Sequence, residues 1–103
     1  MTFLANEAHS RGLAIGLKNA AEIVTSVLPN VEWQVNEQCL QYDECDVFQP
    51  FIDARKPVFH IEYPSDAPDV SPGVKAENCG AVSASGLSTV LKATNLDAWI
   101  DPC

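Results

Sequence analysis

Four short apolar runs, each followed by a segment of helical character, constrain the fold of this chain more than any other feature. The runs cover residues 13–19, 31–37, 58–63 and 87–92. Pro29 and Gly86 stand at the ends of two of the intervening helical segments. Strands that alternate with helices predict a parallel sheet in which the helices form the crossover connections. We therefore expect one α/β domain built from about four βα units.

The segments around these runs carry recognisable boundary signals. We expect helices over residues 2–11, 20–28 and 75–85, a helix around residues 47–52, and a last helical turn over residues 96–100. Asn19 with Glu22 resembles a capping box, and Asp43 is placed to cap the helix that contains Phe48. Residues 64–74 contain three prolines and a glycine, which predicts a loop.

Each predicted strand ends in polar residues. They are Lys18 and Asn19, Asn36 and Glu37, Glu62 and Tyr63, and Lys92. The carboxyl ends of parallel strands lie on one face of a sheet or barrel, where substrates bind. We therefore expect these side chains to converge on one site.

The alternation of side chains along each strand refines this prediction. It puts Trp33 and Val35 on the opposite face from Gln34 and Asn36. We expect the apolar set to face the helices and the polar set to line the barrel interior or its mouth. The polar set comprises Lys18, Gln34, Asn36, His60 and Glu62. Glu37 falls on the bend just beyond the strand.

Glu37 and Glu62 are carboxylates at the ends of neighbouring strands, and glycosidic bond cleavage uses a pair of carboxylates. Glu37 lies between two amide side chains on a bend flanked by cysteines, which favours a catalytic role. Glu62 has two other interpretations: an ion pair with Lys18 or Lys92, or a contact with a substrate hydroxyl or amine. The sequence contains no Gly-rich phosphate loop, and we expect no cofactor.

The four cysteines are Cys39, Cys45, Cys79 and Cys103, and they allow three pairings if all are bonded. No C-x-x-C motif occurs and no nearby histidine completes a zinc set, so disulfides are favoured over a metal site. Cys39 and Cys45 are close enough for a local disulfide, and Cys79 with Cys103 would fix the C-terminus. Disulfides indicate an oxidising compartment.

The net charge of −8 and the pI near 4.4 limit the classes of partner. They argue against nucleic acid and anionic membrane surfaces and suit a cationic substrate. No stretch approaches the ~20 apolar residues of a membrane span. Residues 1–10 lack the basic start and long apolar run of a signal peptide.

Four stretches of the chain resemble the endo-α-1,4-polygalactosaminidases, glycoside hydrolase family 114. They are AHSRGLAIGLKNA (8–20), VNEQCLQYDECD (35–46), PFIDARKPVFHIEY (50–63) and GLSTVLK (86–92). The resemblance implies a TIM-barrel enzyme that acts outside the cell on α-1,4-linked galactosamine polymers. It implies that Glu37 is one of two catalytic carboxylates, that Lys18 and Glu62 line the site, and that the partner carboxylate is an Asp on an earlier strand. We also assign Asn36 and Tyr63 to substrate binding.

A complete (β/α)₈ barrel needs roughly 200 residues or more, about twice the length of this chain. We therefore interpret residues 1–103 as the C-terminal half of such a domain, without activity on its own. The alternative is a non-catalytic half-barrel that binds carbohydrate or pairs with a second copy of the chain.

Overall fold

A five-stranded sheet forms the centre of the molecule in the computed structural model, which describes residues 1–103. The strands lie in sequence order: β1 (Gly16–Lys18), β2 (Trp33–Glu37), β3 (Val58–Glu62), β4 (Ser88–Leu91) and β5 (Asp101–Pro102). The first four are parallel, and β5 pairs with β4 in the antiparallel direction. Four parallel strands with helical crossovers confirm the predicted α/β fold.

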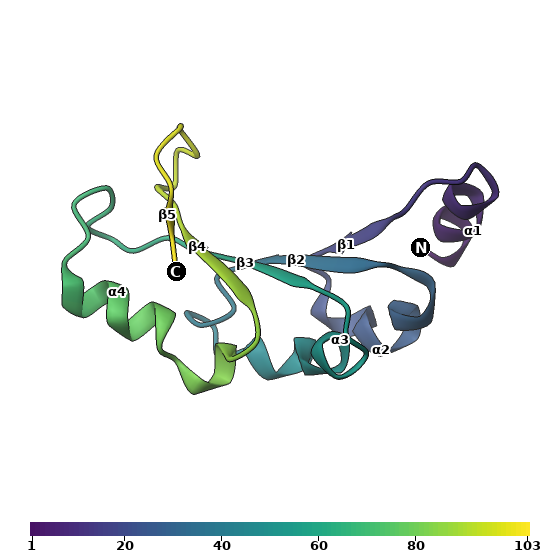
Figure 1. The fold of residues 1–103 in the computed structure, drawn as a ribbon, viewed down its shortest axis with the longest axis horizontal. Coiled ribbons are helices and arrows are strands. Elements are labelled where there is room, and N and C mark those ends of the chain that lie inside the picture. Colours follow the sequence, from purple (N-terminus) through teal and green to yellow (C-terminus); the bar gives the residue numbers. More distant parts are fainter.

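Short helical segments connect the strands. They are α1 (Thr2–Ser10), η1 (Ala21–Ile23), α2 (Val24–Val27), η2 (Leu28–Asn30), η3 (Cys45–Phe48), α3 (Gln49–Asp53), α4 (Pro72–Cys79) and η4 (Val82–Ala84), where η marks a 3₁₀ turn. The helices α2 and α3 lie under one face of the sheet (Figure 1). No helix is long and apolar enough to cross a lipid bilayer.

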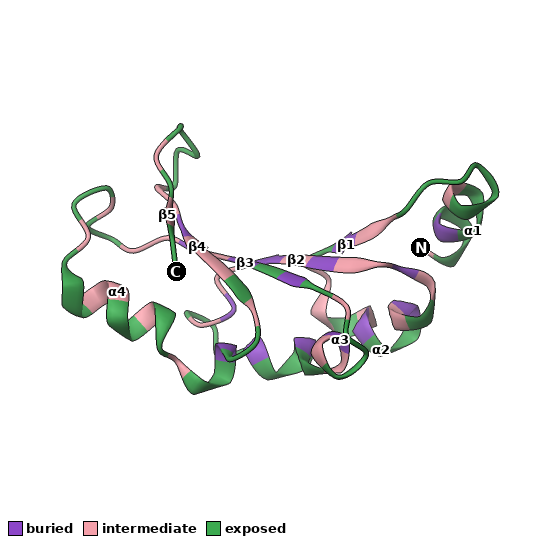
Figure 2. Ribbon diagram, in the orientation of Figure 1, coloured by how far each residue is buried: buried purple, intermediate pink, exposed green.

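The hydrophobic core lies between that face and the helices. Leu17 of β1 and Val58 of β3 pack in one cluster with Val24 and Val27 of α2 and Phe51 of α3. Buried residues accordingly concentrate in the strands and in the helices beneath them (Figure 2). The helix α4 contributes no buried residue.

The opposite face of the sheet has no covering layer. Phe59 of β3 is 45% exposed there. Beside it lies an open hollow of about 660 Å³, lined among others by Ile61, Leu87 and Val90. Trp33 lies over Gly16 on the neighbouring strand, since a Cβ placed on Gly16 would be 2.0 Å from the indole Nε1.

Five polar side chains were predicted to line the barrel interior or its mouth, on the face away from the helices. This prediction is wrong for four of them. Gln34, Asn36, His60 and Glu62 are all buried. They share the strand parity of the core residue Val58 and therefore lie on the helix-covered face. Hydrogen bonds to one another and to the backbone replace water around these groups, so a hydrophobic pattern does not reveal their burial. Lys18 does lie on the open face.

Several predicted boundaries also differ. In place of the helix predicted over residues 20–28, residues 21–30 form a 3₁₀ turn, the four-residue α2 and a second 3₁₀ turn. Asn19 and Ala20 both have positive φ, and Asn19 caps no helix. The predicted loop ends earlier, since Ser71 caps α4 by accepting a hydrogen bond from the N–H of Val74 at 3.3 Å. Asp43 has a left-handed backbone and does not cap η3.

The predicted helical turn at residues 96–100 is wrong, because that segment leads without helix into β5. The Cys79–Cys103 disulfide and an ion pair between Lys75 and Asp101 (2.8 Å) fasten β5 to α4. The Cys39–Cys45 disulfide closes the loop after β2. Both predicted disulfides are therefore confirmed.

Candidate active site

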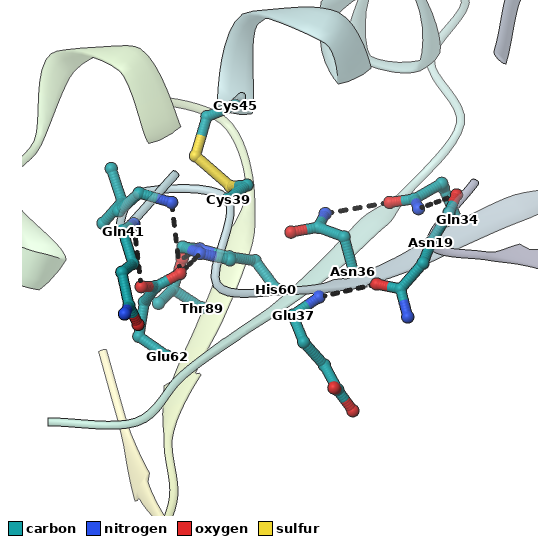
Figure 3. The surroundings of a disulfide bond; sticks show 11 residues. Asn19, Gln34, Asn36, Glu37, Cys39, Gln41, Cys45, His60, Glu62 and Thr89 are labelled. Atoms are coloured by element: carbon teal, nitrogen blue, oxygen red, sulfur yellow. Dashed lines mark hydrogen bonds and ion pairs between the residues drawn. A yellow bond between two sulfur atoms is a disulfide. The ribbon is translucent and has the colours of Figure 1, made fainter. Parts of the chain in front are cut away.

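Glu37 is the last residue of β2 and lies at the carboxyl edge of the parallel strands. Its side chain is 29% exposed, and one carboxylate oxygen lies 3.3 Å from the Nζ of Lys18 at the end of β1. Figure 3 shows this side chain pointing away from Asn36. Glu37 therefore presents its carboxylate to the open face, beside a cation.

Backbone hydrogen bonds fix the position of Glu37. Its N–H donates to the side-chain Oδ1 of Asn19 at 3.0 Å, and the N–H of Gln38 donates to the carbonyl of Ile61 at 2.7 Å. Gln38 has a φ of 63°, in the left-handed region, so the chain turns sharply directly after Glu37. The side chain of Asn19 thus supports this bend instead of capping a helix.

Tyr63 belongs to the same end of the sheet as Glu37. Burial, and then the negative charge of the Glu37 carboxylate, raise the pKa of the Tyr63 hydroxyl above its ordinary value. The hydroxyl is protonated at neutral pH, as its ordinary pKa of 10.0 already requires. It remains available as a hydrogen-bond donor.

Glu62 lies behind this edge, on the helix-covered face, and is only 4% exposed. Its carboxylate accepts hydrogen bonds from the backbone N–H groups of Leu40 (3.2 Å) and Gln41 (3.3 Å) and contacts the Nε2 of His60 at 2.6 Å. Figure 3 shows these contacts beneath the cysteine loop. The expected ion pair of Glu62 with Lys18 or Lys92 is absent, because these groups occupy the carboxylate instead.

Asn36 is also enclosed, with 1% exposure. Its Nδ2 donates to the Oε1 of Gln34 at 2.9 Å, and the Nε2 of Gln34 donates to the carbonyl of Val35 at 2.9 Å. The Oδ1 of Asn36 has no hydrogen-bond partner. Asn36 therefore lies within the same buried polar layer as His60.

The potential metal-ligand atoms of Cys39, Cys45 and His60 lie within 4.8 Å of one another. This proximity could not be predicted from the spacing of the residues, because His60 is distant from both cysteines along the chain. The two sulfur atoms are joined in a disulfide, which removes the thiolates that a metal site of this type requires.

Comparison with known proteins places the chain in a family. All residues, 1–103, match the sequence model of glycoside-hydrolase family GH114. The chain belongs to family GH114. The crystal structure of Aspergillus fumigatus Ega3 in complex with galactosamine matches with a TM-score of 0.87 and 46% sequence identity. The match covers 98% of the present chain and 42% of the Ega3 chain. No curated protein matches the chain.

The GH114 chain thus brings together three of the five predicted site residues, namely Lys18, Glu37 and Tyr63. It places Asn36 and Glu62 behind them. The role of Asn19, which holds the backbone of Glu37, was not predicted from the sequence. The position of Asn19 beside Lys18 at a strand end is the signal that points to the site.

Proposed function

We propose that this GH114 chain supplies the C-terminal half of an endo-acting enzyme, which hydrolyses internal bonds of α-1,4-linked galactosamine polymers. The observation that carries the proposal is the placement of Glu37, whose carboxylate projects from a fixed strand end beside Lys18. The 46% identity to Ega3, whose crystal structure contains galactosamine, supports the substrate class. An acidic chain also suits a polymer that carries ammonium groups.

Glu37 acts in this proposal as one of two catalytic carboxylates, either protonating the leaving oxygen or activating the attacking group. The Nζ of Lys18 lies 3.3 Å from the Glu37 carboxylate and helps to orient it, and Tyr63 donates a hydrogen bond to the substrate. The buried Glu62 is hydrogen-bonded on both oxygens and does not serve as the second carboxylate. We assign that role to an Asp of the complementary half.

The uncovered face supports the proposal that residues 1–103 are half of a barrel domain. Phe59 and the hollow beside it are apolar, and β1 pairs on one side only. Strand edges and apolar faces of this kind are covered in complete barrels. We therefore expect no hydrolysis by these 103 residues alone. The two disulfides fit a protein that acts outside the cell.

A chimeric enzyme tests this function. The 103 residues replace the matching segment of Ega3, so that the remaining part of Ega3 completes the barrel. We expect the chimera to release oligosaccharides from a galactosamine polymer and Glu37→Gln to reduce kcat by at least about a thousandfold. Glu44→Gln, an exposed glutamate on the cysteine loop, is the matched control. A fully active Glu37→Gln chimera would contradict the catalytic role of Glu37.

A second candidate function is a non-catalytic half-barrel that binds carbohydrate or pairs with another copy of itself. The apolar open face favours it, because that face can be covered by a second chain. Binding of the isolated chain to immobilised galactosamine polymer, together with an inactive wild-type chimera, would favour this alternative over the glycosidase.

A further inference from the structure

A chain of polar groups, centred on the buried His60 and Glu62, joins β4, β3 and the loop after β2, and no catalytic step uses it. The Oγ1 of Thr89 on β4 lies 2.8 Å from the Nδ1 of His60 on β3, and the Nε2 of His60 lies 2.6 Å from the carboxylate of Glu62. The carboxylate of Glu62 then accepts hydrogen bonds from the backbone N–H groups of Leu40 and Gln41. Both residues lie in the loop that follows Glu37, the last residue of β2. The series runs from β4 through β3 to the loop after β2 (Figure 3).

The hydrogen-bonding pattern is complete with a neutral imidazole. The Nε2–H of His60 donates to the carboxylate of Glu62, which has no donor of its own when ionised. The Nδ1 of His60 then accepts a hydrogen bond from the hydroxyl group of Thr89. A buried carboxylate without partners would be costly, but three N–H groups satisfy Glu62. Contacts at both ring nitrogens thus fix the orientation of the His60 imidazole.

The bend that this network anchors is strained. Gln38 carries a side chain yet adopts a φ of 63°, a conformation that persists only where the surroundings enforce it. The N–H of Gln38 donates a hydrogen bond to the carbonyl of Ile61, and Ile61 lies between His60 and Glu62 in β3. The same strand therefore holds the bend twice, once through its backbone and once through the Glu62 side chain.

We propose that Glu62 and His60 are positioning residues of the site: with Thr89 they hold the Cys39–Cys45 loop, and through it Glu37, in the catalytic geometry. This inference rests on the proposed catalytic role of Glu37. The network touches no substrate, because Glu62 and His60 are buried on the face opposite to the Glu37 carboxylate. Its effect on catalysis is transmitted through the bend.

Thr89→Val tests the network without altering charge, because it exchanges a hydroxyl for a methyl group of similar size. We expect amide hydrogen exchange of Leu40 and Gln41 to accelerate about tenfold, the equivalent of one lost hydrogen bond. We also expect the pKa of Tyr63 to fall toward its ordinary value of 10.0 as the Glu37 carboxylate moves away. Thr89→Ser keeps the hydroxyl and should behave as the wild type. Both readouts use the 103-residue chain and the chimera.

Glu62→Gln in the chimera tests the kinetic consequence. A positioning role predicts a fall in kcat of at least about tenfold, with a KM within about twofold of the wild type. The matched control is Glu77→Gln, which alters an exposed glutamate near the same loop that has no ion pair. Rates are expressed per folded molecule, so that a loss of stability alone does not count as support.

Two results would overturn the inference. The first is wild-type amide exchange of Leu40 and Gln41 in both Thr89→Val and Glu62→Gln. The second is a destabilised Glu62→Gln chimera whose kcat per folded molecule is unchanged, since that is the result of a purely structural role. An inactive wild-type chimera would count against the proposed function instead, and amide exchange with the Tyr63 titration would then decide whether the network holds the bend.

Discussion

A single glycine determines how closely β1 and β2 pack on the open face. The indole of Trp33 occupies the space where any side chain at position 16 would begin, with 2.0 Å between Nε1 and an added Cβ. Gly16→Ala therefore forces the indole or the strand to move, and we expect it to lower the free energy of unfolding by roughly 1 to 3 kcal/mol. Urea unfolding measures this change.

Gly73→Ala is the control for that substitution. Gly73 lies in α4 with open space around it, and alanine is the better helix former there. We expect it to leave stability unchanged or to raise it slightly. Equal destabilisation by both substitutions would show that contact with Trp33 is not the cause.

A second residue-scale prediction concerns pH. A hydrogen bond from His9 on α1, and then one from the backbone N–H of Ile15, lower the pKa of Glu32 below 4.5. A glutamate whose pKa is lower in the folded state stabilises the fold above its unfolded pKa. That stability is lost as the pH falls through the lower, folded value.

Glu32→Gln should therefore reduce stability at neutral pH and flatten its decline on acidification below about pH 4.5. Urea unfolding of both proteins across this acidic range provides the comparison. Glu22→Gln is a suitable control, because Glu22 has no ion pair or side-chain hydrogen bond. Parallel pH profiles for Glu32→Gln and the wild type would contradict the prediction.

At the scale of elements, the hydrophobic pattern predicted what depends on local sequence. The four parallel strands and both disulfides followed from apolar runs, turn residues and cysteine spacing. Which face of each strand packs against the helices could not be predicted in this way. His60 and Glu62 are buried because of hydrogen bonds that form only once β3, β4 and the cysteine loop are together. The two-residue strand β5 was missed since tertiary contacts define it.

The disulfide that links β5 to α4 leads to a prediction about stability and activity. The Cys79–Cys103 disulfide spans a separation of 24 residues, so its removal frees a long loop in the unfolded chain. We expect the double variant Cys79→Ala/Cys103→Ala to lose roughly 3 kcal/mol of stability. In the chimera its kcat should stay within about twofold of the wild type, because β5 lies on the far side of β4 from Glu37. Chemical denaturation and steady-state kinetics measure the two effects, and a large fall in kcat per folded molecule would show that β5 supports the site.

At the scale of the whole molecule, one layer of helices covers one face of the sheet and the other face stays open (Figure 1). The open face carries Phe59, Ile61 and Val90 around one hollow. Apolar surface of this kind associates with whatever apolar surface is available. The isolated chain should therefore self-associate, whereas the same face should be buried in the chimera.

Phe59→Ser separates these two situations. In the isolated chain Phe59 is 45% exposed, so the substitution should reduce self-association, measured as molar mass by light scattering, and cost little stability. In the chimera Phe59 would contact the complementary half, and the same substitution should cost roughly 3 kcal/mol. Val82→Ser alters another exposed apolar residue, located on η4, and should change neither property. A Phe59→Ser chimera as stable as its parent would show that the complementary half leaves this face uncovered, contrary to a shared barrel interior.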